Sequence, residues 1–335
     1  MIYKESLKFT RSRNSLAMTY MHKNYKKKFS FLSKFWLHTC LGLVLLASVQ
    51  TVKAQLPQTR IYLFDLQRSQ KGMKVSNGHL ISKNKGYNNQ PSFSPDSRYL
   101  YFSSSIDSTN TELFKMDLEK KKPRLVRLTK TKEPEYSPKI TPDMDRISCV
   151  SVERDTVTQH LYTLNLKGKK PQVVLPQLKT IGYYEWITSY EFVSFELPEP
   201  FYLVKHNLNF SKVDTMATQI GRTFFYYRSK GRIVYVDKSD SLHWKIKTLN
   251  PNPKKNPEPN NTLCETLPGE EDFCILMDGS LLQGHQGVLY YLKNPFRFQE
   301  SKWESLIDMN QFGFKKFQRL AVSYDNTKLA VVALP

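Results

Sequence analysis

Short runs of apolar and aromatic residues recur along the chain from residue 60 to its end. Runs such as residues 99–103, 146–152 and 191–197 are rich in Val, Ile, Phe and Tyr, and turn-forming residues separate them. Runs of this length and composition are typical of β-strands. The pattern therefore predicts an all-β fold.

The runs belong to a repeat of 47 residues. The segment QPSFSPD (residues 90–96) corresponds to SPKITPD (residues 137–143), and residues 276–279 and 323–326 are separated by the same interval. Two less regular copies lie at residues 185–189 and 224–230. Units of about 40–50 residues with four short strands are typical of a β-propeller. Six such units predict a six-bladed β-propeller.

The two ends of the predicted propeller are expected to share one blade. The last unit stops after two strands, at residues 320–323 and 328–334, whereas two strand-like runs at residues 60–66 and 78–82 precede the first full unit. We therefore expect the N-terminal strands to complete the C-terminal blade. Such closure removes exposed sheet edges and fixes both ends of the domain.

Turn chemistry explains the most regular positions of the repeat. Proline sets a backbone angle that suits a turn, and aspartate accepts a hydrogen bond from the backbone two residues further on. We predict turn formation, and no catalytic role, for the repeated aspartates: Asp96, Asp143, Asp278 and Asp325. Residues 250–261 contain four prolines and are predicted to form a solvated loop between the last two strands of the fourth blade.

The charge distribution predicts an export signal at the N-terminus. The chain carries 50 Lys and Arg against 30 Asp and Glu, a net charge of +20, and residues 1–54 hold ten of the basic residues but one acid. A basic run at residues 26–28 precedes an apolar stretch at residues 35–49 and a small-residue cleavage site before Gln55. This order is typical of a signal peptide. We predict a signal peptide over residues 1–54, with Met18 or Met21 as alternative starts.

Residues 55–335 are predicted to form a single propeller domain, monomeric, and either periplasmic or secreted. We expect no stable membrane insertion after cleavage, because the apolar stretch is shorter than the roughly 20 residues of a spanning helix. The basic residues of this part are spread out without a nucleic-acid-binding motif, so they are assigned to solvated faces and nucleic acid is excluded as a partner.

The cysteines leave one question open. Cys149 lies in an apolar run and is expected to be a buried free thiol. Cys264 and Cys274 can either form a disulfide in an oxidising compartment or remain unpaired in the core.

Four segments carry a resemblance to a known family: residues 90–101 (QPSFSPDSRYLY), 140–152 (ITPDMDRISCVSV), 277–280 (MDGS) and 319–332 (RLAVSYDNTKLAVV). They resemble the TolB-like, WD-repeat-like family of six-bladed propellers, in particular exported members from Bacteroidetes-type bacteria. The resemblance covers residues 60–335 and implies the fold more strongly than the function. Family copies usually carry Ser-Pro-Asp-Gly, whereas this chain has Ser97, Met144 and Asn326 at the glycine position.

No catalytic, metal-binding or cofactor-binding motif stands out. The chain has no Gly-x-Ser-x-Gly segment, no His-Glu-x-x-His segment and no phosphate-binding glycine-rich loop. We predict no catalytic residues, no metal and no cofactor. Two alternatives stay open: a metal-dependent lactonase- or hydrolase-type propeller enzyme with dispersed acidic ligands, and a sensor of a carbohydrate or small ligand.

A candidate ligand-binding ring follows from the repeat. The position six residues before each turn aspartate, or before its counterpart, should lie where the chain enters the innermost strand of each blade. The predicted ring is Gln90, Ser137, Tyr183, Phe224, Asp272 and Arg319. Mixed aromatic and charged surfaces suit protein recognition; alternatively, these residues pack the hub and pair with one another. The sequence thus predicts an exported, non-catalytic module that binds a protein or peptide in the bacterial cell envelope.

Overall fold

The computed structural model describes residues 56–69, 72–105, 110–120, 122–210, 212–254, 259–297, 301–313 and 316–334. The predicted signal peptide lies outside these residues, and the chain from Leu56 forms a compact unit of its own. Apart from strands, the described residues contain two short 3₁₀ helices, η1 (Arg228–Lys230) and η2 (Met309–Phe312). No helix in the described ranges is long and apolar enough to cross a membrane.

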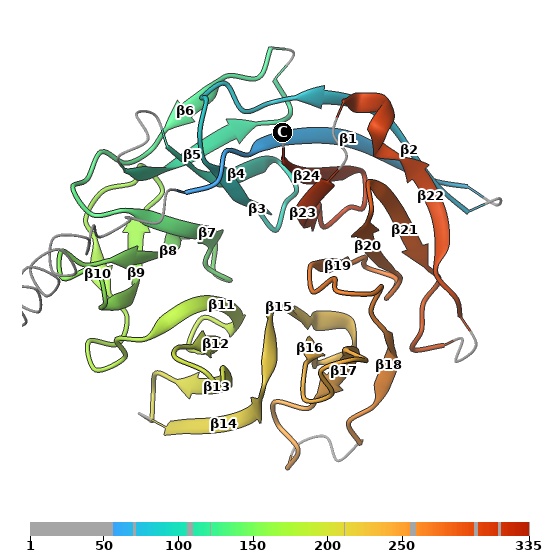
Figure 1. The fold of residues 1–335 in the computed structure, drawn as a ribbon. Coiled ribbons are helices and arrows are strands. Elements are labelled where there is room, and N and C mark those ends of the chain that lie inside the picture. Colours follow the sequence, from blue (N-terminus) through green and yellow to red (C-terminus); the bar gives the residue numbers. More distant parts are fainter. Residues whose placement is uncertain are drawn as a thin grey trace, which may run out of the picture. The chain divides into compact units, whose positions relative to one another are not determined.

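The strands form six four-stranded antiparallel sheets, arranged as the blades of a propeller (Figure 1). From the innermost strand outward, blade one is β3 (Asn88–Phe93), β4 (Tyr99–Ser105), β5 (Thr111–Asp117) and β6 (Leu125–Arg127). Blade two is β7 (Glu135–Ile140), β8 (Arg146–Val152), β9 (Gln159–Asn165) and β10 (Gln172–Val173). Blade three is β11 (Ile181–Thr188), β12 (Glu191–Glu196), β13 (Tyr202–Asn207) and β14 (Lys212–Thr218).

The second half of the chain repeats the arrangement. Blade four is β15 (Ile220–Tyr227), β16 (Arg232–Asp237), β17 (Lys245–Leu249) and β18 (Thr262–Glu265). Blade five is β19 (Phe273–Ile275), β20 (Leu281–His285), β21 (Val288–Leu292) and β22 (Glu304–Asp308). Blade six is β23 (Lys316–Val322), β24 (Lys328–Leu334), β1 (Arg60–Ser69) and β2 (Gly72–Leu80). The predicted six-bladed propeller is confirmed.

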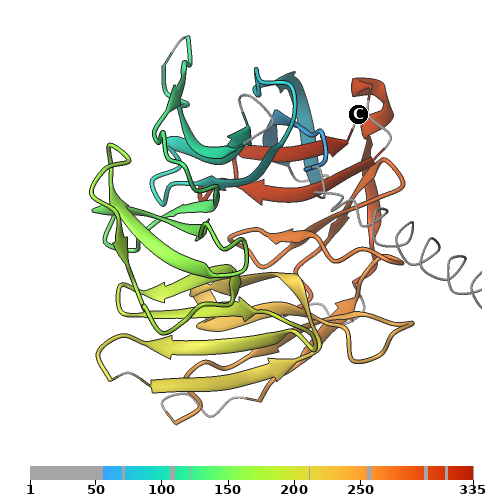
Figure 2. The same ribbon diagram turned by 60° about the vertical axis from the view of Figure 1, so that its left-hand side comes forward.

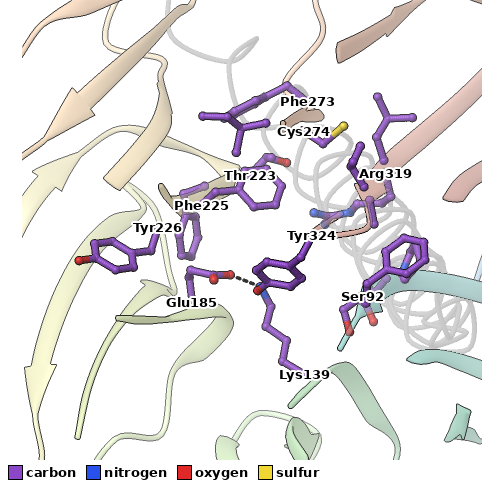
Figure 3. A pocket seen from close by; sticks show the side chains of 18 of the residues that line it. Ser92, Lys139, Glu185, Thr223, Phe225, Tyr226, Phe273, Cys274, Arg319 and Tyr324 are labelled. Atoms are coloured by element: carbon purple, nitrogen blue, oxygen red, sulfur yellow. Dashed lines mark hydrogen bonds and ion pairs between the residues drawn. The ribbon is translucent and has the colours of Figure 1, made fainter. Parts of the chain in front are cut away.

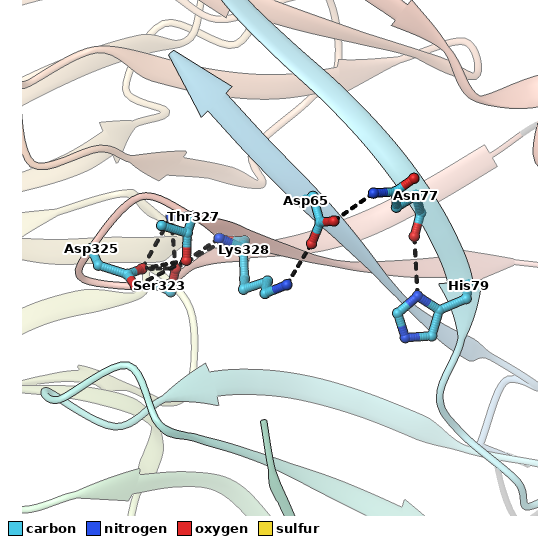
Figure 4. A network of polar contacts seen from close by, with 7 residues as sticks. All are labelled: Asp65, Asn77, His79, Ser323, Asp325, Thr327 and Lys328. Carbon is cyan, nitrogen blue, oxygen red and sulfur yellow. Dashed lines mark hydrogen bonds and ion pairs between the residues drawn. The ribbon is translucent and has the colours of Figure 1, made fainter. Parts of the chain in front are cut away.

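The predicted closure of the ring by the N-terminal strands is also confirmed. β1 pairs with β24 from Arg60↔Ala333 to Asp65↔Lys328, and Figures 1 and 2 show the blue strand beside the red one. β2 starts at Gly72, earlier than the predicted run, because it pairs with β1 along most of its length. Lys328 Nζ lies 2.5 Å from Asp65 Oδ1 across this junction, and Asn77 Nδ2 donates to Asp65 Oδ2 at 2.7 Å (Figure 4). Backbone pairing and an ion pair therefore join the two ends.

The four repeated aspartates form turns as predicted. In each turn one carboxylate oxygen accepts the backbone N–H two residues on, as Asp325 Oδ1 does from Thr327 at 3.0 Å (Figure 4). The equivalent distances are 3.1 Å at Asp96, 3.2 Å at Asp143 and 2.9 Å at Asp278. The next residue has a left-handed backbone, with φ of 60° at Ser97, 62° at Met144, 86° at Gly279 and 57° at Asn326. This conformation favours glycine and explains the glycine of the family pattern.

The buried hydrophobic residues of the described ranges form six clusters, each between two neighbouring blades. In β24, for example, Leu329 and Val331 pack against blade five, whereas Ala330 and Val332 pack against blade one. Successive side chains of a strand point to opposite faces, and here both faces are covered. Because both faces are buried, the middle strands have apolar residues at nearly every position.

Close packing between blades five and six predicts a steric effect at Gly284. A Cβ atom at this position of β20 would lie 2.1 Å from the buried Phe317 ring of β23. We expect Gly284→Ala to lower the free energy of unfolding by about 2 kcal/mol, because overpacking forces neighbouring side chains to shift. Urea unfolding measures the change, and adding Phe317→Leu, which makes room, should recover part of it. An unchanged urea midpoint for Gly284→Ala would contradict the packing.

The proline-rich loop lies where it was predicted, between β17 and β18, but its first residues are not solvated. Asn250 and Pro251 are buried, because Lys205 of blade three donates to Pro251 O at 2.9 Å and to Asn252 Oδ1 at 2.7 Å. The same ammonium lies 2.9 Å from Glu191 Oε1. The loop thus links blade four to blade three.

The structure decides between the two alternatives for the cysteines. Cys264 and Cys274 are free, because Cys264 lies on the outermost strand of blade four and Cys274 on the innermost strand of blade five. Cys149 is a buried free thiol, as predicted.

Candidate functional site

A cavity of about 200 Å³ lies at the hub of the propeller, lined by residues of the innermost strand of every blade (Figure 3). Its walls carry aromatic side chains, such as Tyr226 and Tyr324, beside charged ones, such as Lys139 and Glu185. Because the six strands converge here, the cavity brings together residues that are far apart in the sequence.

All six predicted ring residues line this cavity: Gln90, Ser137, Tyr183, Phe224, Asp272 and Arg319. In three blades the position has the same unusual backbone, with φ of 57° at Gln90, 53° at Ser137 and 49° at Arg319. Each of these three residues lies at an irregularity in the pairing of its innermost strand with the next strand. A bulge at this point re-aims the side chain, which is how the repeat directs the position toward the channel.

The ring residues contact one another. The backbone N–H of Ser137 donates to Gln90 Oε1 at 2.9 Å, between blades two and one. The Arg319 guanidinium lies 4.4 Å from the centre of the Tyr183 ring, although blades six and three lie on opposite sides of the hub. Phe224 is buried between blades three and four. These contacts match the alternative in which the ring packs the hub, and a role in ligand binding stays a prediction.

Asp272 is contacted by two cationic side chains and one hydroxyl group. Arg222 Nη2 lies 2.5 Å from Asp272 Oδ2, Thr223 Oγ1 donates to Oδ1 at 2.9 Å, and Arg319 Nη1 lies 3.5 Å from Oδ1. Burial alone would raise the pKa of Asp272, but the positive charges of Arg319 and Arg222 outweigh it and lower the pKa to about 2. The carboxylate is therefore ionised at every physiological pH.

The opposite end of the cavity is more accessible. Met277 is 48% exposed and Tyr324 is 37% exposed, and each lies two residues beyond the end of an innermost strand, next to a turn aspartate. Arg228, which also lines the cavity, is exposed, and Lys139 forms an ion pair with Glu185 between blades two and three (Figure 3). We call this accessible end the mouth of the cavity, and the ring its floor.

Sequence reasoning missed the mouth residues. A signal for two of them was present, since Met277 and Tyr324 each directly precede a turn aspartate. That position marks the exit of an innermost strand, where side chains remain in solvent. Counting back six residues instead selects the bulge, where side chains turn inward and meet.

One buried cluster contains the residue types of a hydrolase triad, but its geometry does not fit. Ser194 Oγ lies 2.8 Å from His206 Nε2, and Glu196 Oε1 lies 2.9 Å from the same nitrogen. A catalytic triad places the serine and the acid on different ring nitrogens. Ser194 is also fully buried. Across the described ranges, no three His, Cys, Asp or Glu side chains gather as a metal site.

Comparisons with known proteins identify the fold. No protein-family model matches the chain, and no curated protein sequence matches it significantly. A structure described as TolB from Agrobacterium tumefaciens matches with a TM-score of 0.60 and 14% identity, over 82% of this chain and 98% of that one. The fold is that of TolB-like propellers.

Two further structures show the same likeness. TolB from Acinetobacter baumannii matches with a TM-score of 0.52 and 9% identity, over 82% of this chain and 64% of that one. A chain of a nidogen/laminin complex matches with a TM-score of 0.55 and 11% identity, over 82% and 98%. At these identities the likeness extends to the fold alone, so relation to exported Bacteroidetes-type proteins stays a prediction.

Proposed function

We propose that the protein is an exported, non-catalytic β-propeller that binds a protein or peptide of the bacterial cell envelope in its central cavity. The observation that carries the proposal is the mouth, where the partly exposed side chains of Tyr324 and Met277 line the cavity together with the charged Lys139, Glu185 and Arg228. Tyrosine and arginine are common anchors of protein interfaces, because they combine apolar contact area with hydrogen bonding.

Two further observations support the proposal. The fold is shared with TolB structures and with a chain from a nidogen/laminin complex, which is a complex between proteins. The export part of the proposal rests on the signal-peptide pattern of residues 1–54. In this account the closed ring presents its strand ends rigidly, so binding requires little rearrangement of the propeller.

Binding through the mouth predicts a loss of affinity for Tyr324→Ala. The exported protein, immobilised, captures its partner from envelope extract, and calorimetry with the purified partner then gives the dissociation constant. We expect Tyr324→Ala to weaken binding at least about tenfold, since an interface anchor contributes more than 1 kcal/mol.

A matched control is Tyr190→Ala. Tyr190 is 44% exposed in the turn between β11 and β12 and does not line the cavity. We expect this variant to bind as the unmodified protein does. Equal affinities for the two tyrosine variants would place the binding site elsewhere on the propeller.

A further inference from the structure

The ring closes one end of the central channel. Arg319 and Tyr183 meet across the hub, while Arg222 and Asp272 pair beside them at 2.5 Å. Tyr87 is buried next to this group. Burial and the nearby Tyr183 raise the pKa of its hydroxyl, whereas the positive charge of Arg319 lowers it. Arg319, Tyr183, Arg222 and Asp272 belong to four different blades, and Tyr87 directly precedes β3 of blade one. A polypeptide therefore has no open path through the channel at this level.

Positive charge exceeds negative charge inside the cavity. Four cationic side chains and two carboxylates line it: Lys139, Arg222, Arg228 and Arg319 against Glu185 and Asp272. The Lys139 ammonium is already paired with Glu185. Asp272 makes its short contact with Arg222, whereas the contact from Arg319 is 3.5 Å long. The guanidinium of Arg319 thus retains donors for another acceptor, and Figure 3 shows it extending from its strand into the pocket.

The walls between floor and mouth are mainly apolar. Ile140, Ile275 and Val322 line the cavity and are only half-buried in the structure. An occupant that covers them would gain from the removal of apolar surface from water.

We propose that the cavity is a blind pocket for the C-terminus of a polypeptide, with the terminal carboxylate held by Arg319 and the last side chains against the apolar walls. This proposal rests on the proposed function. A closed floor admits a chain end more easily than a chain segment that must enter and leave by the same mouth. The excess of cationic groups selects the carboxylate end over the ammonium end.

The experiment uses an array of random decapeptides coupled through their N-termini, each made both with a free C-terminal carboxylate and as the C-terminal amide. We expect the unmodified protein to bind a set of sequences as free acids and to bind the same sequences about tenfold to a hundredfold more weakly as amides, as for a lost charge-assisted hydrogen bond. This comparison needs no variant, so the stability of variants does not affect it.

Two variants assign the effect to the floor. In Arg319→Gln, the acid and amide forms of each peptide should bind with nearly equal affinity, because the charge is gone. In Tyr324→Ala, both forms should bind more weakly by a similar factor, because the mouth contact does not distinguish them. Circular dichroism and thermal melting confirm that each variant is folded.

The outcomes separate this inference from the function on which it rests. Binding of peptides with equal affinity for acids and amides would overturn the C-terminal proposal and leave peptide binding in place. A preference for internal Asp or Glu, regardless of the C-terminal group, would overturn it as well. Failure of every peptide in both forms would count against both proposals.

Discussion

Replacing Asp272 by alanine is expected to lower the free energy of unfolding by about 3–5 kcal/mol at pH 7. The carboxylate is buried and balances two cations, with Arg222 at 2.5 Å and Arg319 at 3.5 Å. Removing it leaves both guanidinium groups close together without this counter-charge. Breaking a buried ion pair costs more than its formation gains, because the remaining charge stays desolvated. Urea unfolding at pH 7 measures the loss.

The pH dependence gives a second test of the same group. The pKa of Asp272 is lowered to about 2 in the folded state, below the ordinary value of 3.8. Its stabilising effect is therefore fully present above the unfolded value and is lost as the pH falls through the folded value. The difference between the unmodified protein and Asp272→Ala should shrink between about pH 4 and pH 2.

Asp278→Ala is the matched control for Asp272→Ala. Asp278 forms a turn hydrogen bond and pairs with the exposed Arg68 at 2.5 Å, so we expect a loss of only about 1 kcal/mol. If both alanine variants lowered the free energy of unfolding equally, the electrostatic account of the floor would be wrong.

Replacing Glu135 by glutamine is expected to raise the free energy of unfolding at pH 8 by about 3 kcal/mol. Glu135 is buried in β7, and burial raises the pKa of its carboxyl group to about 7 from the ordinary 4.5. The nearby buried Glu112, which forms an ion pair with Arg127 at 3.0 Å, adds to the increase by charge repulsion. At pH 8 the folded protein must therefore hold an ionised Glu135 carboxylate in a buried position close to Glu112.

The sign of the effect follows from proton binding. Between about pH 4.5 and pH 7 the folded state keeps the proton of Glu135 while the unfolded state has lost it, so stability falls as the pH rises through this range. Glutamine cannot ionise and removes this dependence. Unfolding experiments at pH 4.5 and pH 8 measure it, with the exposed Glu304→Gln as control. A difference between Glu135→Gln and the unmodified protein that is the same at both pH values would contradict the prediction.

The fold could be predicted because its repeated features are local. The turn aspartates bond to the backbone within two residues, and the left-handed residue that follows each of them is also a local requirement. The middle strands bury both faces, so their apolar runs are visible without knowledge of their neighbours. Even the shared sixth blade followed from counting strands at the two ends.

The site could be predicted only in part. The repeat selected six residues that line one cavity, because a bulge recurs at the same place in several blades. It could not show that Arg319 and Tyr183 meet across the hub, since this depends on the width of the channel and on the length of both side chains. The raised pKa of Glu135 likewise arises from burial and from Glu112 on another blade, and neither is visible in a strand pattern.

Binding of a partner in the hub cavity is best tested by a crystal structure of the protein with its captured partner. We expect a segment of the partner inside the cavity, in contact with Tyr324 at the mouth and reaching toward Arg319 at the floor. A partner bound only to the outer strands of the blades, with the cavity filled by solvent, would contradict it.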